Sequence, residues 1–268
     1  MSFAPADGPA LRIFSYLPNP RLMKATIAAR MCGVALELRG AKPRELSGWL
    51  WDFDARPLGA GEGHAGDARE ARTGFAGTLR KTDAFLEAHP FGNVPAAWSP
   101  DGAIGIFESN SIARAVARLG ADRAPLYGAD PYTASRIDGF LDASLVFARD
   151  AQFYLLKLAS GKLKPPTHER ARVAIESWLA GIEQALAPAR VALVGDALTL
   201  ADIVFVTELA LFSAERASNH VLAQAGLPPL FGEALEARFP RAFAHYARLR
   251  AHPDFAPDLA PYLEKLGG

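Results

Sequence analysis

Glu108 and Ser109 lie where a predicted strand ends and a predicted helix begins. A helix N-terminus presents free backbone N–H groups and the positive end of the helix dipole, so a carboxylate ligand suits it. The Ser109 hydroxyl is a further donor, and the Glu108 carboxylate can accept a bond from an ammonium group. A plain structural role also fits both residues, because serine is a common N-cap and carboxylates favour helix N-termini.

Asn19 and Pro20 form a second candidate junction. Asparagine is a good N-cap and proline a good first helical residue, so the pair predicts the start of a helix. The Asn19 side chain also carries N–H groups that can donate to a ligand as a hydroxyl does. Ser15 and Tyr16, at the end of the preceding predicted strand, supply hydroxyls close by.

Other reactive residue types carry weaker signals. The single cysteine, Cys32, lies near the end of the predicted first helix, away from the positive end of its dipole, and we expect a core thiol. His245 and His252 are seven positions apart with no third ligand nearby, so we expect no metal site. The glycine-rich residues 59–63 lack the Lys-Ser/Thr ending of a phosphate-binding loop.

The first 120 residues predict a mixed sheet. Alternating residues at 11–16 and 34–38 flank a helix that opens at Asn19-Pro20 and ends at Gly33, which predicts a βαβ unit with parallel strands. Further on, the patterns predict a helix at 82–88, a hairpin of strands 95–98 and 103–107, and a helix at 109–119. The stretch between is harder to interpret: it predicts a short packed element at 49–53 and a loop at 59–77.

The second half has no strand pattern. Apolar residues at helical spacing predict helices at 131–158, 166–186, 199–212 and 240–249. The fold class is therefore α/β followed by all-α, with a composition shift near residue 125. We assign residues 1–120 to the first domain, with an insert at about 41–80, residues 121–130 to a linker, and 131–268 to the helical domain.

Composition excludes some partners and compartments. The formal net charge is zero and 22% of residues are charged, which argues against nucleic acid or an anionic membrane as a partner. One cysteine allows no internal disulfide, the first ten residues do not resemble a signal peptide, and no run of 18 apolar residues is present. We expect a cytoplasmic protein that does not enter the membrane.

Four motifs, in this order, resemble those of the cytosolic glutathione transferases, and the resemblance covers nearly the whole chain. The first helix and the Phe-Glu-Ser-Asn stretch look most like the transferase-like domain of elongation factor 1 gamma. The motifs are Asn19-Pro20-Arg21-Leu22-Met23-Lys24, Asn93-Val94-Pro95, Phe107-Glu108-Ser109-Asn110-Ser111-Ile112-Ala113 and Leu198-Thr199-Leu200-Ala201-Asp202.

The resemblance implies a thioredoxin-like domain with a mixed four-stranded sheet that binds glutathione as co-substrate, without a metal. It implies a cis peptide before Pro95, with the Val94 main chain pairing with the cysteinyl part of glutathione. Asn93 belongs to the same binding loop. Glu108 and Ser109 then hold the γ-glutamyl group, which favours their binding role over plain capping. An ordinary trans proline that starts an edge strand is the alternative at Pro95.

In this family a serine, tyrosine or cysteine near the start of the first helix hydrogen-bonds the glutathione sulfur and favours its thiolate. Asn19 stands at the matching position, which is a departure from the family pattern. Asn19 is thus the candidate catalytic residue, unless it is only an N-cap. Ser15 and Tyr16 are the alternatives, and Arg21 is near enough to add positive charge.

The helical domain supplies two further sets of candidates. Phe140, Ser144 and Phe147 share one helical face and are candidates for the second-substrate pocket, although such a stripe is more often core. Thr199 and Asp202 have the spacing of a capping box, with Asp in place of Glu, and we assign them to folding.

The favoured function is a glutathione transferase whose thiolate attacks an electrophilic, aromatic small molecule. One branch to consider is the cleavage of a β-aryl ether, found in some bacterial relatives. Two alternatives stay open: a non-catalytic scaffold, as in elongation factor 1 gamma, and a silent subunit paired with an active homologue. The family habit implies a homodimer or a heterodimer with a homologous subunit. The electrophile and its stereochemistry are not determined by the sequence.

Overall fold

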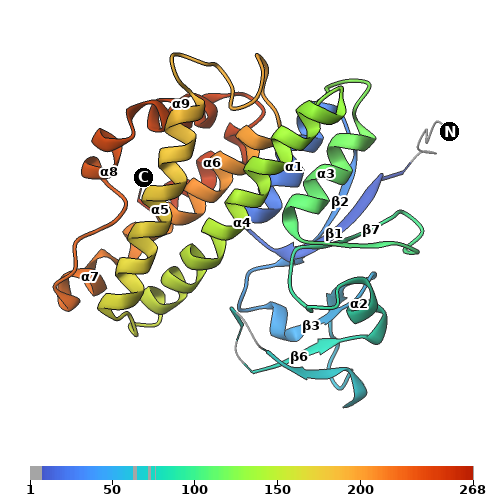
Figure 1. The fold of residues 1–268 in the computed structure, drawn as a ribbon. Helices are drawn as coiled ribbons and strands as arrows, with labels where there is room; N and C mark the ends of the chain where they lie inside the picture. The colour runs from blue at the N-terminus through green and yellow to red at the C-terminus, as the bar shows by residue number, and fades with distance from the viewer. Residues whose placement is uncertain (1–7, 63–64, 72–73, 76, 268) are drawn as a thin grey trace. The chain divides into compact units, whose positions relative to one another are not determined.

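The computed structural model describes residues 8–62, 65–71, 74–75 and 77–267. The chain divides into two compact units, Met1–Ala124 and Pro125–Gly268. Over the described residues, strands occur in the first unit and the second is built of helices (Figure 1). This organisation confirms the predicted fold class, an α/β thioredoxin-like domain followed by an all-helical one.

The first unit contains a mixed four-stranded sheet in the order β2-β1-β7-β8. β1 and β2 run parallel, and β7 is antiparallel to both β1 and β8. The predicted βαβ unit and hairpin are therefore present, although the second strand covers 36–41 rather than 34–38. The strands are β1 (Leu11–Tyr16), β2 (Leu36–Ala41), β7 (Ala96–Trp98) and β8 (Gly105–Phe107).

Helices α1 (Pro20–Cys32) and α3 (Ser109–Leu119) pack against each other in this unit (Figure 1). α1 begins at the Asn19 cap and ends at Gly33, whose φ of 68° is left-handed. A Cβ at Gly33 would collide with the Arg123 side chain, so glycine is required there on both counts. The N-terminus of α3 follows β8 after a single residue, Glu108, which fixes the candidate junction at one edge of the sheet.

The insert holds a second four-stranded sheet that the sequence did not predict, in the order β4-β3-β6-β5. The expected loop at 59–77 is wrong in part, because β5 lies inside it and pairs with β6. Such short strands have no periodicity of their own, and only their partners make them strands. The elements are η1 (Leu46–Gly48), β3 (Trp49–Trp51), β4 (Arg56–Pro57), η2 (Ala65–Asp67), β5 (Ala68–Glu70), β6 (Thr78–Lys81) and α2 (Asp83–Ala88).

One aromatic cluster joins the two sheets. Trp51, from β3, meets Phe14, from β1, edge-to-face with ring centroids 5.3 Å apart, and meets Phe85, from α2, at 5.7 Å. Trp98, from β7, lies 5.9 Å from Phe85. All four side chains are buried. Because aromatic burial and edge-to-face pairing both stabilise such a cluster, the insert shares its core with the first sheet.

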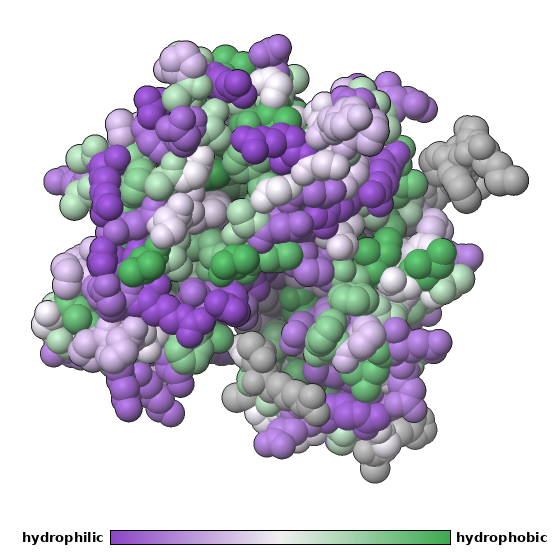
Figure 2. All heavy atoms as spheres, viewed as in Figure 1, coloured by the Kyte–Doolittle hydropathy of each residue, from purple (hydrophilic) through white to green (hydrophobic). Residues whose placement is uncertain are grey.

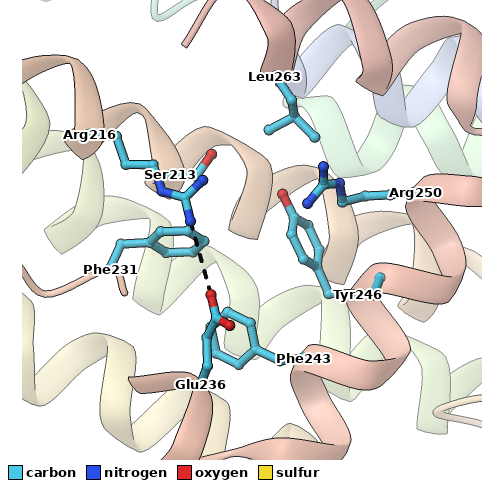
Figure 3. A pocket seen from close by; sticks show the side chains of 9 residues that line it. Ser213, Arg216, Phe231, Glu236, Phe243, Tyr246, Arg250 and Leu263 are labelled. Atoms are coloured by element: carbon cyan, nitrogen blue, oxygen red, sulfur yellow. Dashed lines mark ion pairs between the residues drawn. The ribbon is translucent and has the colours of Figure 1, made fainter. Parts of the chain in front are cut away.

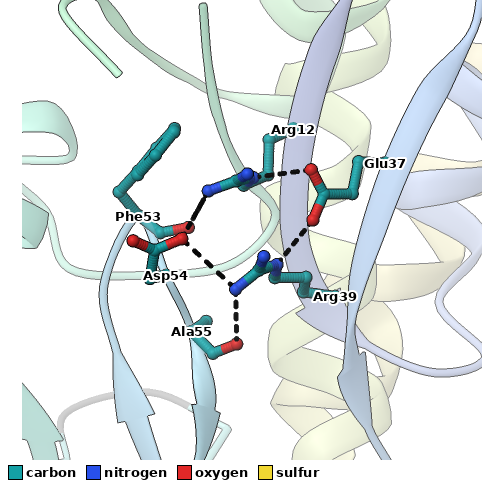
Figure 4. A network of polar contacts seen from close by, with 6 residues as sticks. All are labelled: Arg12, Glu37, Arg39, Phe53, Asp54 and Ala55. Carbon is teal, nitrogen blue, oxygen red and sulfur yellow. Dashed lines mark hydrogen bonds and ion pairs between the residues drawn. The ribbon is translucent and has the colours of Figure 1, made fainter. Parts of the chain in front are cut away.

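A polar network ties the same two parts together at the surface (Figure 4). The Glu37 carboxylate accepts hydrogen bonds from Arg12 and Arg39, each at 2.8 Å. Both guanidinium groups also reach Asp54 in the β3–β4 connection, Arg12 at 2.6 Å and Arg39 at 3.4 Å. Networks of several charges hold their geometry better than single surface ion pairs do.

The second unit has four helices at the predicted places, with ends shifted by a few residues at most. They are α4 (Pro131–Ala159), α5 (Pro165–Ala185), α6 (Leu200–Phe212) and α9 (Pro240–Ala251). Shorter elements escaped prediction because none is long enough to show an apolar stripe. These are η3 (Ser213–Ser218), α7 (Asn219–Ala225), α8 (Glu233–Arg238) and α10 (Ala256–Glu264).

α6 is buried along almost its whole length, and a capping box opens it. The Thr199 hydroxyl accepts from Ala201 N, and the Asp202 carboxylate accepts from Thr199 N at 2.9 Å. The same carboxylate meets His245 Nε2, from α9, at 2.8 Å. Asp202 therefore links the start of the buried helix to a second helix.

The surface in view mixes residue types. Figure 2 shows hydrophobic side chains as small separate patches among hydrophilic ones, which is ordinary for a folded domain. No helix among the described residues is both long and apolar enough to span a membrane.

Candidate functional site

The N-terminus of α3 has an unusual backbone. Glu108 is its N-cap, with a φ of 70°, a left-handed conformation that no other described residue except glycine adopts. Its carboxylate accepts from Asn110 N at 2.7 Å and from the Ser109 hydroxyl at 3.0 Å. Strained backbone of this kind is often found at functional sites, because the surrounding structure must hold it in place.

Lys24, from α1, lies directly against this junction, and sequence reasoning missed its role. The side chain is 0% exposed. Its ammonium donates to Ser109 Oγ at 3.1 Å and to Asn110 Oδ1 at 2.8 Å. The available signal was a lysine on the apolar face of α1, next to Met23 and near Ile27, which are also buried. Buried lysines are rare unless they are paired, and these two acceptors hold the Lys24 ammonium at the start of α3.

The start of α3 can therefore bind a ligand group that carries both a negative and a positive charge. The positive end of α3 and the Lys24 ammonium favour a carboxylate beside the Ser109 hydroxyl. The half-buried Glu108 carboxylate is suited to an ammonium group. An α-amino acid end carries both groups close together, so it matches the pair better than a simple anion does.

The Lys81 side chain holds the loop that precedes β7. Lys81 Nζ donates to Gly92 O at 2.7 Å, and Gly92 has a left-handed φ of 64° with Leu86 and Lys81 packed close to it. Asn93 is exposed, Val94 half-buried and Pro95 buried. The Val94–Pro95 peptide is cis, and the pairing of β7 with β1 begins at the next residue, Ala96.

Asn19 uses its side chain locally. Its Oδ1 caps α1 by accepting from Arg21 N at 2.9 Å, and its Nδ2 donates to Ser15 Oγ at 3.0 Å. Asn19 is 2% exposed, and Ser15 is fully buried inside β1. The capping role is therefore present, and one of the two amide hydrogens remains for a ligand. Tyr16 is half-buried at the end of the same strand.

The Cys32 thiol belongs to the core, as expected. It is buried, and burial raises its pKa to about 11, an effect that Arg123 partly offsets. A thiol with such a pKa is almost entirely protonated at neutral pH and is a poor nucleophile. Among the described residues, no group of three or more His, Cys, Asp or Glu side chains could hold a metal ion.

The candidates for the second-substrate pocket separate in the structure. Phe147 is buried and stacks on Trp178 with centroids 4.3 Å apart, and Ser144 is buried and donates to Leu141 O. These two side chains are buried in the helical unit, and their place in a second-substrate pocket stays a prediction. Phe140 instead lines an open groove of about 400 Å³ between α4 and α5.

Comparison with known proteins connects this site to a family. No protein-family model matches the chain. Elongation factor 1-gamma 3 of Oryza sativa subsp. japonica is 36% identical over 135 residues, which are 50% of this chain and 32% of that protein. The chain thus spans about a third of the length of this relative.

Two further matches cover most of both chains. The structure of the glutathione transferase URE2P8 from Phanerochaete chrysosporium with oxidized glutathione has a TM-score of 0.64 at 15% identity, covering 98% of this chain and 100% of that one. The glutathione S-transferase-like protein FUS3 of Gibberella fujikuroi is 30% identical over 195 residues, 72% of this chain and 76% of that protein. The chain belongs to the glutathione S-transferase superfamily.

Proposed function

We propose that this protein is a glutathione-dependent transferase that joins the glutathione sulfur to an electrophilic small molecule. The contact that carries the proposal is the buried Lys24 ammonium against Ser109 at the N-terminus of α3. The Lys24 ammonium and the positive end of the α3 dipole together place positive charge beside the Ser109 hydroxyl, which suits a ligand carboxylate. The γ-glutamyl end of glutathione supplies a carboxylate and an ammonium group together.

The remaining site residues are assigned from this anchor. The γ-glutamyl carboxylate lies at Ser109, and its ammonium group at Glu108. The Val94 main chain pairs with the cysteinyl part in an extended, strand-like manner, with Asn93 and Pro95 shaping the loop. This assignment directs the sulfur toward the start of α1.

Asn19 is the proposed activating residue. Its second amide hydrogen donates to the sulfur and favours the thiolate, with the N–H groups of the first turn of α1 adding to the effect. The thiolate attacks an electrophilic carbon, a C–S bond forms, and the leaving group departs with its electron pair. With a β-aryl ether the leaving group is a phenolate, which makes this ether cleavage the specific branch to test. Ser15, Tyr16 and Arg21 are the alternative activating groups.

Calorimetric titration with glutathione tests the proposal, combined with the ultraviolet absorbance of the bound thiolate near neutral pH. We expect wild-type protein to bind glutathione and to show thiolate, and Ser109→Ala to weaken binding by about tenfold. Release of a phenol from a β-aryl ether ketone would support the ether branch, and its absence would remove that branch alone. Binding of glutathione without formation of the thiolate would contradict the proposal that this chain activates the sulfur by itself.

A scaffold is the second candidate, and the match to elongation factor 1-gamma over 135 residues favours it. Asn19 stands where the family has Ser, Tyr or Cys, and this departure also favours a non-catalytic scaffold. Absence of glutathione binding would support this reading. A homologous protein that copurifies, together with bound but un-ionised glutathione, would instead support a silent subunit of a heterodimer. A homodimer in the cytoplasm is our working proposal for the active form.

A further inference from the structure

A small cavity of about 110 Å³ lies inside the helical unit (Figure 3). Its walls come from η3, the segment before α8, and helices α8, α9 and α10. Figure 3 shows Arg216, Arg250 and Tyr246 placing polar groups around the space. None of these residues takes part in the glutathione site proposed above.

Tyr246 and Ser213 are the buried residues of this cavity that carry a hydroxyl. The Tyr246 side chain is 4% exposed, and its hydroxyl makes no hydrogen bond of good geometry, although the Ser213 side chain lies close enough to lower its pKa. Burial raises the pKa of Tyr246 to about 12, with Arg250 opposing the rise, so the hydroxyl keeps its proton at neutral pH. Buried hydroxyls are nearly always hydrogen-bonded, because leaving one unsatisfied costs free energy. The Tyr246 hydroxyl can therefore donate a hydrogen bond to an acceptor that enters the cavity.

The charges around the cavity leave one cation unmatched. Arg216 faces Glu236 with 4.0 Å between the charged atoms. Arg250 stands over the Tyr246 ring at 5.3 Å, and no described carboxylate lies within ion-pair distance of it. The Arg216 and Glu236 side chains are 36% and 45% exposed, so the cavity opens to solvent on their side. One positive charge and one hydroxyl donor together favour a monoanion.

The rest of the wall is apolar. Phe231, Phe243 and Leu263 line it, and the Arg216 guanidinium lies 4.8 Å over the Phe231 ring. A dianion such as phosphate gains nothing from these walls and is repelled by Glu236. A carboxylate with a short hydrocarbon chain uses both parts of the cavity. The volume is smaller than the roughly 150 Å³ that accommodates benzene, which limits the chain to a few carbons.

We propose that this cavity is a binding site for a short-chain monocarboxylate, whose carboxylate accepts from Tyr246 and pairs with Arg250 while its chain packs on Phe231 and Phe243. The proposal does not depend on glutathione binding. It assigns to the helical unit a ligand of its own, separate from the proposed transferase chemistry.

Titration calorimetry and thermal unfolding with butyrate test the site, at constant ionic strength. Butyramide serves as the neutral isostere and inorganic phosphate as the small anion without a chain. We expect butyrate to bind and to raise the unfolding temperature, with both effects weak or absent for butyramide and phosphate. Equal effects of butyramide, or stronger effects of phosphate, would overturn the assigned chemistry. No binding of butyrate would mean that the cavity holds water only, and would overturn the proposal.

Single substitutions test whether butyrate binds in this cavity. Tyr246→Phe keeps the buried ring and removes only the hydroxyl, so we expect it to fold and to weaken butyrate binding by about tenfold. Arg250→Met tests the charge independently, since this side chain is exposed. Tyr132→Phe, at an exposed tyrosine on α4, is the matched control and retains binding. Unchanged butyrate affinity in both Tyr246→Phe and Arg250→Met would place the ligand elsewhere.

Discussion

The ammonium of Lys24 donates a hydrogen bond to Ser109 Oγ at 3.1 Å, across 85 positions of sequence. The Ser109 hydroxyl in turn donates to Glu108, so three residues form one chain of hydrogen bonds at the start of α3. Because the lysine occupies an acceptor site of the Ser109 oxygen, the hydroxyl proton must point to another acceptor. In the unliganded protein that acceptor is Glu108, and a ligand carboxylate can replace it.

Lys24→Met is therefore expected to weaken glutathione binding by ten- to a hundredfold, since a hydrogen bond to a charged group contributes about 1.5–3 kcal/mol. Calorimetric titration measures the change, with the exposed Lys162→Met as a control that retains affinity. Cysteinylglycine lacks the γ-glutamyl group, so its weaker binding should be insensitive to Lys24→Met. An equal loss for both ligands would mean that Lys24 acts on the fold and not on the γ-glutamyl end.

Substitutions of Asn19 separate capping from thiol activation. Asn19→Ser keeps a capping oxygen and a donor, whereas Asn19→Asp keeps the cap but has no donor and adds negative charge. We expect bound thiolate in Asn19→Ser and un-ionised glutathione in Asn19→Asp, measured by ultraviolet absorbance. Asn19→Ala should lose the thiolate and also about 1 kcal/mol of stability. If Asn19→Asp still shows bound thiolate, then Ser15, Tyr16 or the backbone activates the glutathione sulfur, and Asn19 does not.

Asp202→Ala is expected to destabilise the helical unit by about 3–5 kcal/mol, because it leaves several buried partners unsatisfied. The carboxylate accepts from Thr199 N, from Leu193 N at 3.0 Å and meets His245 at 2.8 Å. The midpoint of urea unfolding measures the loss. Asp196→Ala, at an exposed aspartate nearby, is the control, and equal midpoints for the two variants would refute the role.

The Glu37 network predicts a dependence of stability on pH. The hydrogen bond from Arg39, then that from Arg12, lowers the pKa of Glu37 below its ordinary value of 4.5 in the folded protein. The unfolded chain thus binds the proton more readily, so the stabilisation is complete above pH 4.5 and is lost as the pH falls below it. Compared with Glu37→Gln, the wild type should be more stable by about 0.5–1 kcal/mol at pH 7.

Chemical unfolding of both proteins at several pH values measures this difference, which should shrink steadily as the solution becomes acidic. Raising the salt concentration at pH 7 should reduce it as well, since the network is partly exposed. A difference that stays constant from pH 7 to below pH 4 would show that Glu37 does not titrate with folding.

Signals that act over a few residues determined the parts that were predicted from sequence. The Asn19-Pro20 start and Gly33 end of α1, the hairpin before Glu108, and the capping box at Thr199 and Asp202 depend on neighbours up to a turn away. Hydrophobic periodicity placed the four longest helices of the second unit for the same reason. The order of these elements and the four motifs were enough to identify the family.

Tertiary structure alone decided the rest, because it depends on which distant segments pack together. Periodicity could not tell that Lys24 lies against Ser109, or that Phe147 stacks on Trp178. The second sheet exists only through the pairing of short strands, none of which has a pattern of its own. The cavity at Tyr246 likewise forms where several short helices meet, so its hydroxyl and its charges come together only in the folded chain.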